Sequence, residues 1–228
     1  MFRFCHYALA LILAASFLHG CAGKQLPIDL IKKEFRDVPT YAIILDDMEE
    51  RGAFFKNYYH KYRIVQQERS WTTDWMKVPQ DYYRRNANFL GMTLAAKKKG
   101  EFDASTGPPG YHYVGDDRYG NWRRDSGGNS FWVFYGQYAF LSHMLGGHRV
   151  FRNDYNTYRD YRTRNRPYYG RNNEFGTKGT ITKRQKPNFY ARQTAKAQAK
   201  KASFSNRVNQ RTGRSRAGYR SRSTSWGK

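Results

Sequence analysis

Two neighbouring carboxylates and one histidine are the residues of this 228-residue chain whose types and spacing could best do chemistry. Asp46 and Asp47 open the polar stretch 46–52, and His60 follows that stretch. If the flanking segments pair as a hairpin, the three side chains could converge on an oxygen-rich metal site or an acid–base pair of an enzyme. The alternative is a polar turn beside a half-buried histidine, because no second histidine at ligand spacing accompanies them.

The other candidate groups form no catalytic pattern. Ser142 and His143 are adjacent, and on a helix their side chains would point about 100° apart, too far for a nucleophile and its base. Three acidic residues lack the spacing and the terminal glutamate of an EF-hand: Asp116, Asp117 and Asp125. His112 lies among aromatic residues, as a packed histidine does. We therefore expect no catalytic residue, no metal ligand and no cofactor.

Two segments with the pattern of β-strands flank the polar residues 46–52 and could position these groups. Residues 41–45 form a β-branched apolar run, and residues 54–65 place apolar and aromatic side chains at every second position, so both predict strands. The polar residues 46–52 between them suit a hairpin connection, although a short helix over 47–56 competes with it.

The middle of the chain predicts two helices and a loop. Residues 77–90 begin with a proline and an aspartate that suit a first helical turn, and residues 91–96 read as a third short strand. Residues 107–128 alternate aromatics with turn residues and predict an ordered loop. Residues 131–145 predict a helix, which Gly146 and Gly147 would end. The fold class expected is α+β, with a short antiparallel sheet and two helices.

Charge is unevenly distributed along the chain. The formal net charge is +23, and residues 175–228 hold fifteen Lys or Arg and no acidic residue. Such a segment predicts a disordered polybasic tail, with a transient helix around residues 190–202. Its partners would be anionic: lipid, lipopolysaccharide or another acidic envelope polymer. The mean hydropathy of −0.92 excludes a polytopic membrane protein.

The N-terminal sequence predicts an export signal. Residues 1–20 combine one early cation with about a dozen apolar residues, which is typical of a secretory signal and too short to span a bilayer. The following Leu18-His19-Gly20-Cys21 resembles the lipobox of bacterial lipoproteins, in which cleavage precedes a lipid-bearing cysteine. His19 departs from that family's preference for a small or apolar residue. Cleavage after Gly23, without lipid, is the alternative.

The resemblance implies a location. Cys21 would carry the lipid, and Ala22 after it resembles an outer-membrane sorting signal of Gram-negative lipoproteins, so we expect an outer-membrane lipoprotein facing the periplasm or the cell surface. An exported protein meets little nucleic acid, which argues against that partner for the basic tail.

Five segments summarise the expected organisation. A signal peptide (1–20) would precede a lipid anchor and tether (21–40), a small α+β domain (41–147), an aromatic and basic linker (148–174) and the polybasic tail (175–228). Residues 110–146 also resemble aromatic- and glycine-rich stretches of envelope lipoproteins without an assigned activity, through 110–115, 119–122 and 131–136. The function expected is a noncatalytic structural or adaptor role in the envelope. The alternative is an envelope enzyme that uses Asp46, Asp47 and His60.

Overall fold

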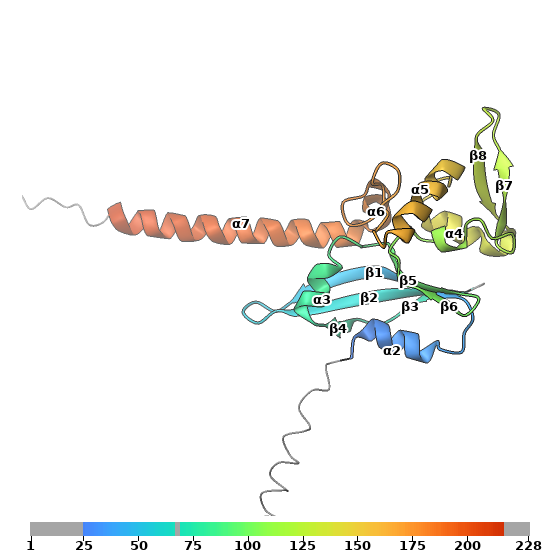
Figure 1. Cartoon of the computed structure of the whole chain (residues 1–228). Helices are drawn as coiled ribbons and strands as arrows, with labels where there is room; N and C mark the ends of the chain where they lie inside the picture. The colour runs from blue at the N-terminus through green and yellow to red at the C-terminus, as the bar shows by residue number, and fades with distance from the viewer. Residues whose placement is uncertain (1–24, 67–68, 217–228) are drawn as a thin grey trace, which may run out of the picture.

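The computed structural model describes residues 25–66 and 69–216, with side chains as far as residue 212, and has an α+β fold (Figure 1). Its main sheet is antiparallel, in the order β3-β2-β1-β5-β6, and β4 pairs with the start of β2. The strands are β1 (Tyr41–Arg51), β2 (Asn57–Val65), β3 (Ser70–Thr72), β4 (Met76–Val78), β5 (Thr93–Lys98) and β6 (Glu101–Asp103). A smaller sheet pairs β7 (Gly120–Arg124) with β8 (Ser130–Phe134). The expected α+β class is confirmed.

The hairpin of β1 and β2 forms the centre of the main sheet. The two strands pair from Ala42 with Val65 to Arg51 with Asn57, so the predicted strands are confirmed and β1 is longer than expected. The polar residues 46–51 belong to β1 and not to the turn, and the competing helix over 47–56 is wrong. Carboxylates are tolerated in this strand because cations from the C-terminal part of the chain pair with them, as described below.

Six α-helices occur among the described residues, where two were expected. They are α2 (Pro27–Glu34), α3 (Gln80–Arg85), α4 (Ala139–Met144), α5 (Arg152–Thr163), α6 (Thr180–Gln185) and α7 (Pro187–Arg216), and the short 3₁₀ turns η2 (Tyr111–Tyr113) and η3 (Gly136–Tyr138) accompany them. In Figure 1, α2 lies on one side of the main sheet, and α4, α5 and α6 lie on the other. No helix in the described part of the chain is both long and apolar enough to cross a membrane.

Each face of the main sheet packs against its own apolar cluster. Along β1, Ala42 and Ile44 point into one cluster and Ile43 into the other, as the period of two in a strand requires. Ile28 and Ile31 of α2 are buried in the second cluster, so this part of the expected tether packs as a helix.

Residues 131–145 are not one helix. They form β8, η3 and α4 in succession. Asp125 explains the start of β8, because its carboxylate accepts hydrogen bonds from the backbone N–H groups of Gly127 and Asn129 and so closes a tight turn between β7 and β8. The predicted glycine ending is present: Gly146 and Gly147 follow α4 with φ of 65° and 74°.

The described part of the basic tail is ordered, so the expectation of disorder is wrong there. Phe175 and Ile181 belong to the first cluster and Phe189 to the second, so the chain between Ile181 and Phe189 passes from one face of the sheet to the other. From Pro187 the chain continues as α7, a helix of 30 residues that extends away from the sheet (Figure 1). Its alanine, lysine, glutamine and arginine content favours a helix even where few side chains pack.

Candidate functional site: the acidic strand and the basic helix

The acidic half of β1 lies against the basic C-terminal part of the chain. The pairing of β5 with β1 ends at Ile44, so beyond it β1 has β2 on one side and no described strand on the other. Three ion pairs join this stretch to the residue just before α7 and to the first turns of α7. We call them the β1–α7 seam: Asp46–Lys186, Asp47–Arg192 and Glu50–Lys196.

The two sides of the seam have matching lengths. Four residues of a strand rise about 13 Å, and ten residues of a helix rise about 15 Å. Successive acids between residues 46 and 50 can therefore face successive cations between residues 186 and 196. Since both sets follow chain order, α7 runs in the same direction as β1.

Asp46 is the most enclosed acid of the seam, with 12% of its side chain exposed. Its Oδ1 accepts hydrogen bonds from Lys186 Nζ at 2.6 Å and from Arg63 Nε at 2.9 Å. Burial alone would raise the pKa of Asp46, but the two cations outweigh it and hold the pKa below its usual value. A carboxylate that is ionised and engaged in this way is a poor general base.

An open cavity of about 290 Å³ lies beside Asp46. Arg63 and Lys186 line it together with Asp46, and His143 and Met144 of α4 also form part of its wall. Two cations surround one carboxylate here, so this cavity has an excess of positive charge among those groups.

Asp47 and Glu50 fasten the helix further along the strand. Arg192 Nη2 donates to both carboxylate oxygens of Asp47, at 2.6 Å each. Glu50 Oε2 accepts hydrogen bonds from Lys196 at 2.7 Å and from Lys56 at 3.1 Å. The hydrogen bond from Lys196 is the largest influence on the pKa of Glu50, which lies below its usual value. These contacts fix the first three turns of α7 to the sheet.

His60 lies on the other face of the sheet from Arg63 and Asp46. Its ring is fully buried against Tyr82 and Tyr83, and its Nδ1 lies 3.1 Å from the hydroxyl oxygen of Tyr62. Burial lowers the pKa of His60 to about 4, so the ring is neutral at pH 7. The hypothetical site of two aspartates and this histidine is not assembled, because residues 60 and 63 of one strand point to opposite faces.

A polar cleft of about 270 Å³ beside β5 and α5 gathers charges that the sequence did not connect. Asp103 Oδ2 lies 2.7 Å from Arg162 Nε and 3.6 Å from His112 Nε2. Lys98 Nζ lies 3.2 Å from a carboxylate oxygen of Asp116. Burial lowers the pKa of His112 to about 4 and also lowers that of Lys98. The principal cations of this cleft thus already face carboxylates.

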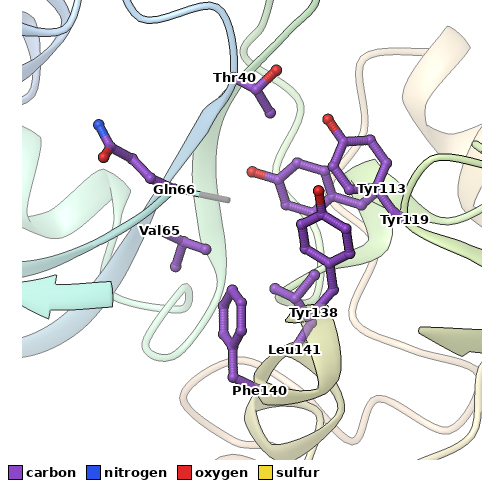
Figure 2. Close-up of a pocket in the computed structure, with 8 residues that line it drawn as sticks. All are labelled: Thr40, Val65, Gln66, Tyr113, Tyr119, Tyr138, Phe140 and Leu141. Carbon is purple, nitrogen blue, oxygen red and sulfur yellow. The ribbon is translucent and has the colours of Figure 1, made fainter. Parts of the chain in front are cut away.

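A small gap between the sheet and α4 is apolar. Figure 2 shows the rings of Tyr113, Tyr119 and Tyr138 gathered on one side of it and Val65 on the other. The enclosed volume is about 10 Å³, room for at most one water molecule. We therefore interpret it as a packing defect and not as a binding pocket.

The tip of the β1–β2 hairpin carries two unburied aromatic rings. Phe54 and Phe55 are 95% and 89% exposed, although the alternation of residues 54–65 had suggested that Phe54 begins a strand. Gly52 turns the chain here with φ of 101°, and a Cβ on it would lie 2.0 Å from the carbonyl oxygen of Phe55. Only glycine fits this turn.

Sequence reasoning missed the seam for a simple reason. Asp46 and Lys186 are 140 residues apart, and nothing in the sequence around either residue indicates that the two pair. The only signal was compositional: an acid-rich stretch near residue 50 and an acid-free segment after Glu174. Cys21, the predicted lipid attachment site, lies outside the described residues.

Comparison with known proteins does not assign this chain to a family. No protein-family model matches the chain, and neither a curated protein nor a solved structure resembles it significantly. Within the described residues, no group of three or more His, Cys, Asp or Glu side chains could hold a metal ion.

Proposed function

We propose that the protein is a lipid-anchored, noncatalytic component of a bacterial cell envelope that binds anionic envelope components through α7. The expected location is the outer membrane, with the protein facing the periplasm or the cell surface. Its role would be structural or that of an adaptor between this membrane and an acidic partner.

The basic helix α7 is the observation that carries the proposal. It contains eight Lys or Arg residues and no acidic residue. Arg192 and Lys196 neutralise β1, but four later cations form no ion pair with any residue that the structure describes: Lys200, Lys201, Arg207 and Arg211. Unpaired cations on one helix attract anionic surfaces, and each contributes up to about 1 kcal/mol near an acidic membrane.

The N-terminal sequence supports the membrane part of the proposal. Cys21 follows an apolar run directly, and the rest of the mature chain has no other cysteine. Several acyl chains, at about 0.8 kcal/mol for each buried methylene group, would hold the protein on the membrane essentially permanently. Anchoring would also keep α7 close to its anionic partner and so raise its local concentration.

The described residues favour this role over an enzymatic one. Asp46 and Asp47 are engaged by cations of the seam, and His60 is enclosed on the other face of the sheet. The alternative of an envelope enzyme at these three residues therefore has less support than binding by α7.

Binding to anionic vesicles tests the proposal. The variant with Lys200, Lys201, Arg207 and Arg211 all changed to Gln should bind at least tenfold more weakly than the parent. The matched control removes four exposed cations elsewhere: Lys33, Lys77, Arg84 and Arg124, all changed to Gln. Parent binding should also weaken as salt rises to about 0.5 M, because the screening length shrinks. Equal binding by the α7 variant and the control variant would contradict the proposal.

A further inference from the structure

We infer that the partner of α7 is the surface of an anionic lipid bilayer, and that Phe54 and Phe55 at the hairpin tip insert between its headgroups. This inference rests on the proposed function and names the chemistry of its partner. A soluble polyanion would use the cations alone, whereas a bilayer also offers an apolar layer to aromatic rings.

The apolar residues of α7 lie between its cations. At about 100° per residue, Lys200, Arg207 and Arg211 fall within about 40° of one another around the helix. Phe204 and Val208 come next, at about 40° and 80° from Lys200, and Lys201 follows at about 100°. The exposed fractions of Phe204 and Val208 are 68% and 41%. An apolar strip flanked on both sides by cations is the pattern of a helix that lies in an anionic membrane interface.

The hairpin tip lies at the same level as this strip. Counted from the Glu50–Lys196 pair, Phe204 is eight residues further along α7, or about 12 Å. The chain reverses between the paired residues Arg51 and Asn57, so the tip lies only about three residues, or roughly 10 Å, beyond Glu50 in the same direction. Figure 1 shows the hairpin pointing along α7, toward the free end of the helix. The tip and the strip therefore lie at a similar level along the axis of α7.

Charge near the tip does not oppose insertion. Glu49 lies 3.1 Å from Arg51, and Glu50 is held by Lys56 and Lys196, so these acids are neutralised locally. The Arg51 guanidinium also lies 4.6 Å from the centre of the Tyr59 ring and 5.3 Å from that of Trp75.

Those two aromatic side chains suit the interface. Tyr59 and Trp75 each combine an apolar ring with a polar group, and side chains of this type favour the boundary between lipid and water. Both rings lie against Arg51, the last residue of β1 before the turn that carries Phe54 and Phe55.

Vesicle and polyphosphate binding together test the inference. The chain used lacks residues 1–20, the predicted signal peptide, and carries Cys21→Ser, so every described residue is kept. Its vesicles contain two parts phosphatidylcholine and one part phosphatidylglycerol. The double variant Phe54→Ser/Phe55→Ser should bind these vesicles at least tenfold more weakly and should bind soluble polyphosphate as the parent does. Leu30→Ser, which changes an exposed apolar residue of α2, is the matched control and should bind both normally.

Insertion can be measured directly because this background contains no cysteine. Phe55→Cys carries an environment-sensitive dye, which should shift to shorter wavelength on vesicles and be quenched by spin-labelled lipid. The same dye at Leu30→Cys should show neither effect.

The outcomes separate this inference from the proposed function. Vesicle binding unchanged in Phe54→Ser/Phe55→Ser, or a dye at Phe55→Cys that stays in water, would overturn the inference and leave charge-based binding intact. Failure of the proposed function appears instead as unchanged binding by the α7 charge variant to both vesicles and polyphosphate. A parent dimer that the double variant converts to a monomer, with vesicle binding unchanged, would assign the tip to a second copy and also overturn the inference.

Discussion

Asp46 Oδ1 accepts a hydrogen bond from Lys186 Nζ at 2.6 Å across a separation of 140 residues. Lys186 stands between the end of α6 and Pro187, the first residue of α7. The ion pair therefore holds the junction of the two helices against β1, at the point where the chain passes from one face of the sheet to the other. Arg63 completes the arrangement from β2.

Replacing Asp46 should destabilise the fold. In Asp46→Asn the charges of Lys186 and Arg63 remain, partly buried and without their carboxylate, so we expect a loss of about 1–3 kcal/mol in the free energy of unfolding. Urea denaturation at pH 7 measures it. Asp81→Asn is the control, because Asp81 pairs with Arg85 on α3 with both side chains 65% exposed and should change stability by less than about 0.5 kcal/mol. Equal losses in the two variants would contradict the structural role of Asp46.

Stability should fall as the pH falls from about 6.5 to about 4. Burial lowers the pKa of both His60 and His112 to about 4, whereas an unfolded histidine titrates near 6.5. Within this window the unfolded chain binds protons that the folded chain does not. At pH 4, each histidine therefore lowers the free energy of unfolding by up to about 3 kcal/mol. The lowered pKa values of Asp46 and Glu50 add a further loss only as the pH falls below about 4.

A single variant separates the contribution of His60. His60→Gln should have a smaller slope of unfolding free energy against pH between 6.5 and 4, measured by urea denaturation at several pH values. His143→Gln makes the same change at an exposed histidine of α4 and serves as the control for the substitution itself. A parent whose stability is constant over this window would contradict the buried, neutral state of the two rings.

Lipid attachment should depend on Cys21. In Cys21→Ser the acceptor thiol is missing, so the protein should not incorporate a fatty-acid analogue in growing cells and should leave the membrane fraction or stay unprocessed. Cys5→Ser, within the predicted signal peptide, should label normally. Labelling of Cys21→Ser at the level of the parent would rule out the lipobox interpretation.

Local patterns sufficed for most of β2 and for the first half of β1. The alternation from Tyr58 to Ile64 predicted which side chains of β2 are buried, because a period of two depends only on the strand itself. The same reasoning failed at residues 131–145, where an apolar run is compatible with helix or strand. The turn around Asp125 and the pairing with β7 place a strand at the start of this run, in β8, and only its later part is helical.

The basic segment illustrates what composition can and cannot determine. Its charge and its lack of acids were plain from the sequence, and so was the helical tendency around residues 190–202. Its order was not, because burial of Phe175, Ile181 and Phe189 depends on surfaces made by distant segments.

The sequence by itself determined the charge distribution and the alternation of β2, since each of these depends on residues close together in the chain; the export signal stays a prediction. Only the tertiary structure decided the use of the acids in β1. Asp46 and Asp47 looked like candidates for chemistry with His60, yet the pleat of the strands turns His60 to the opposite face, and the two carboxylates meet cations of the C-terminal segment instead. Such pairings depend on which distant surfaces come together when the cores form, and no local pattern encodes that contact.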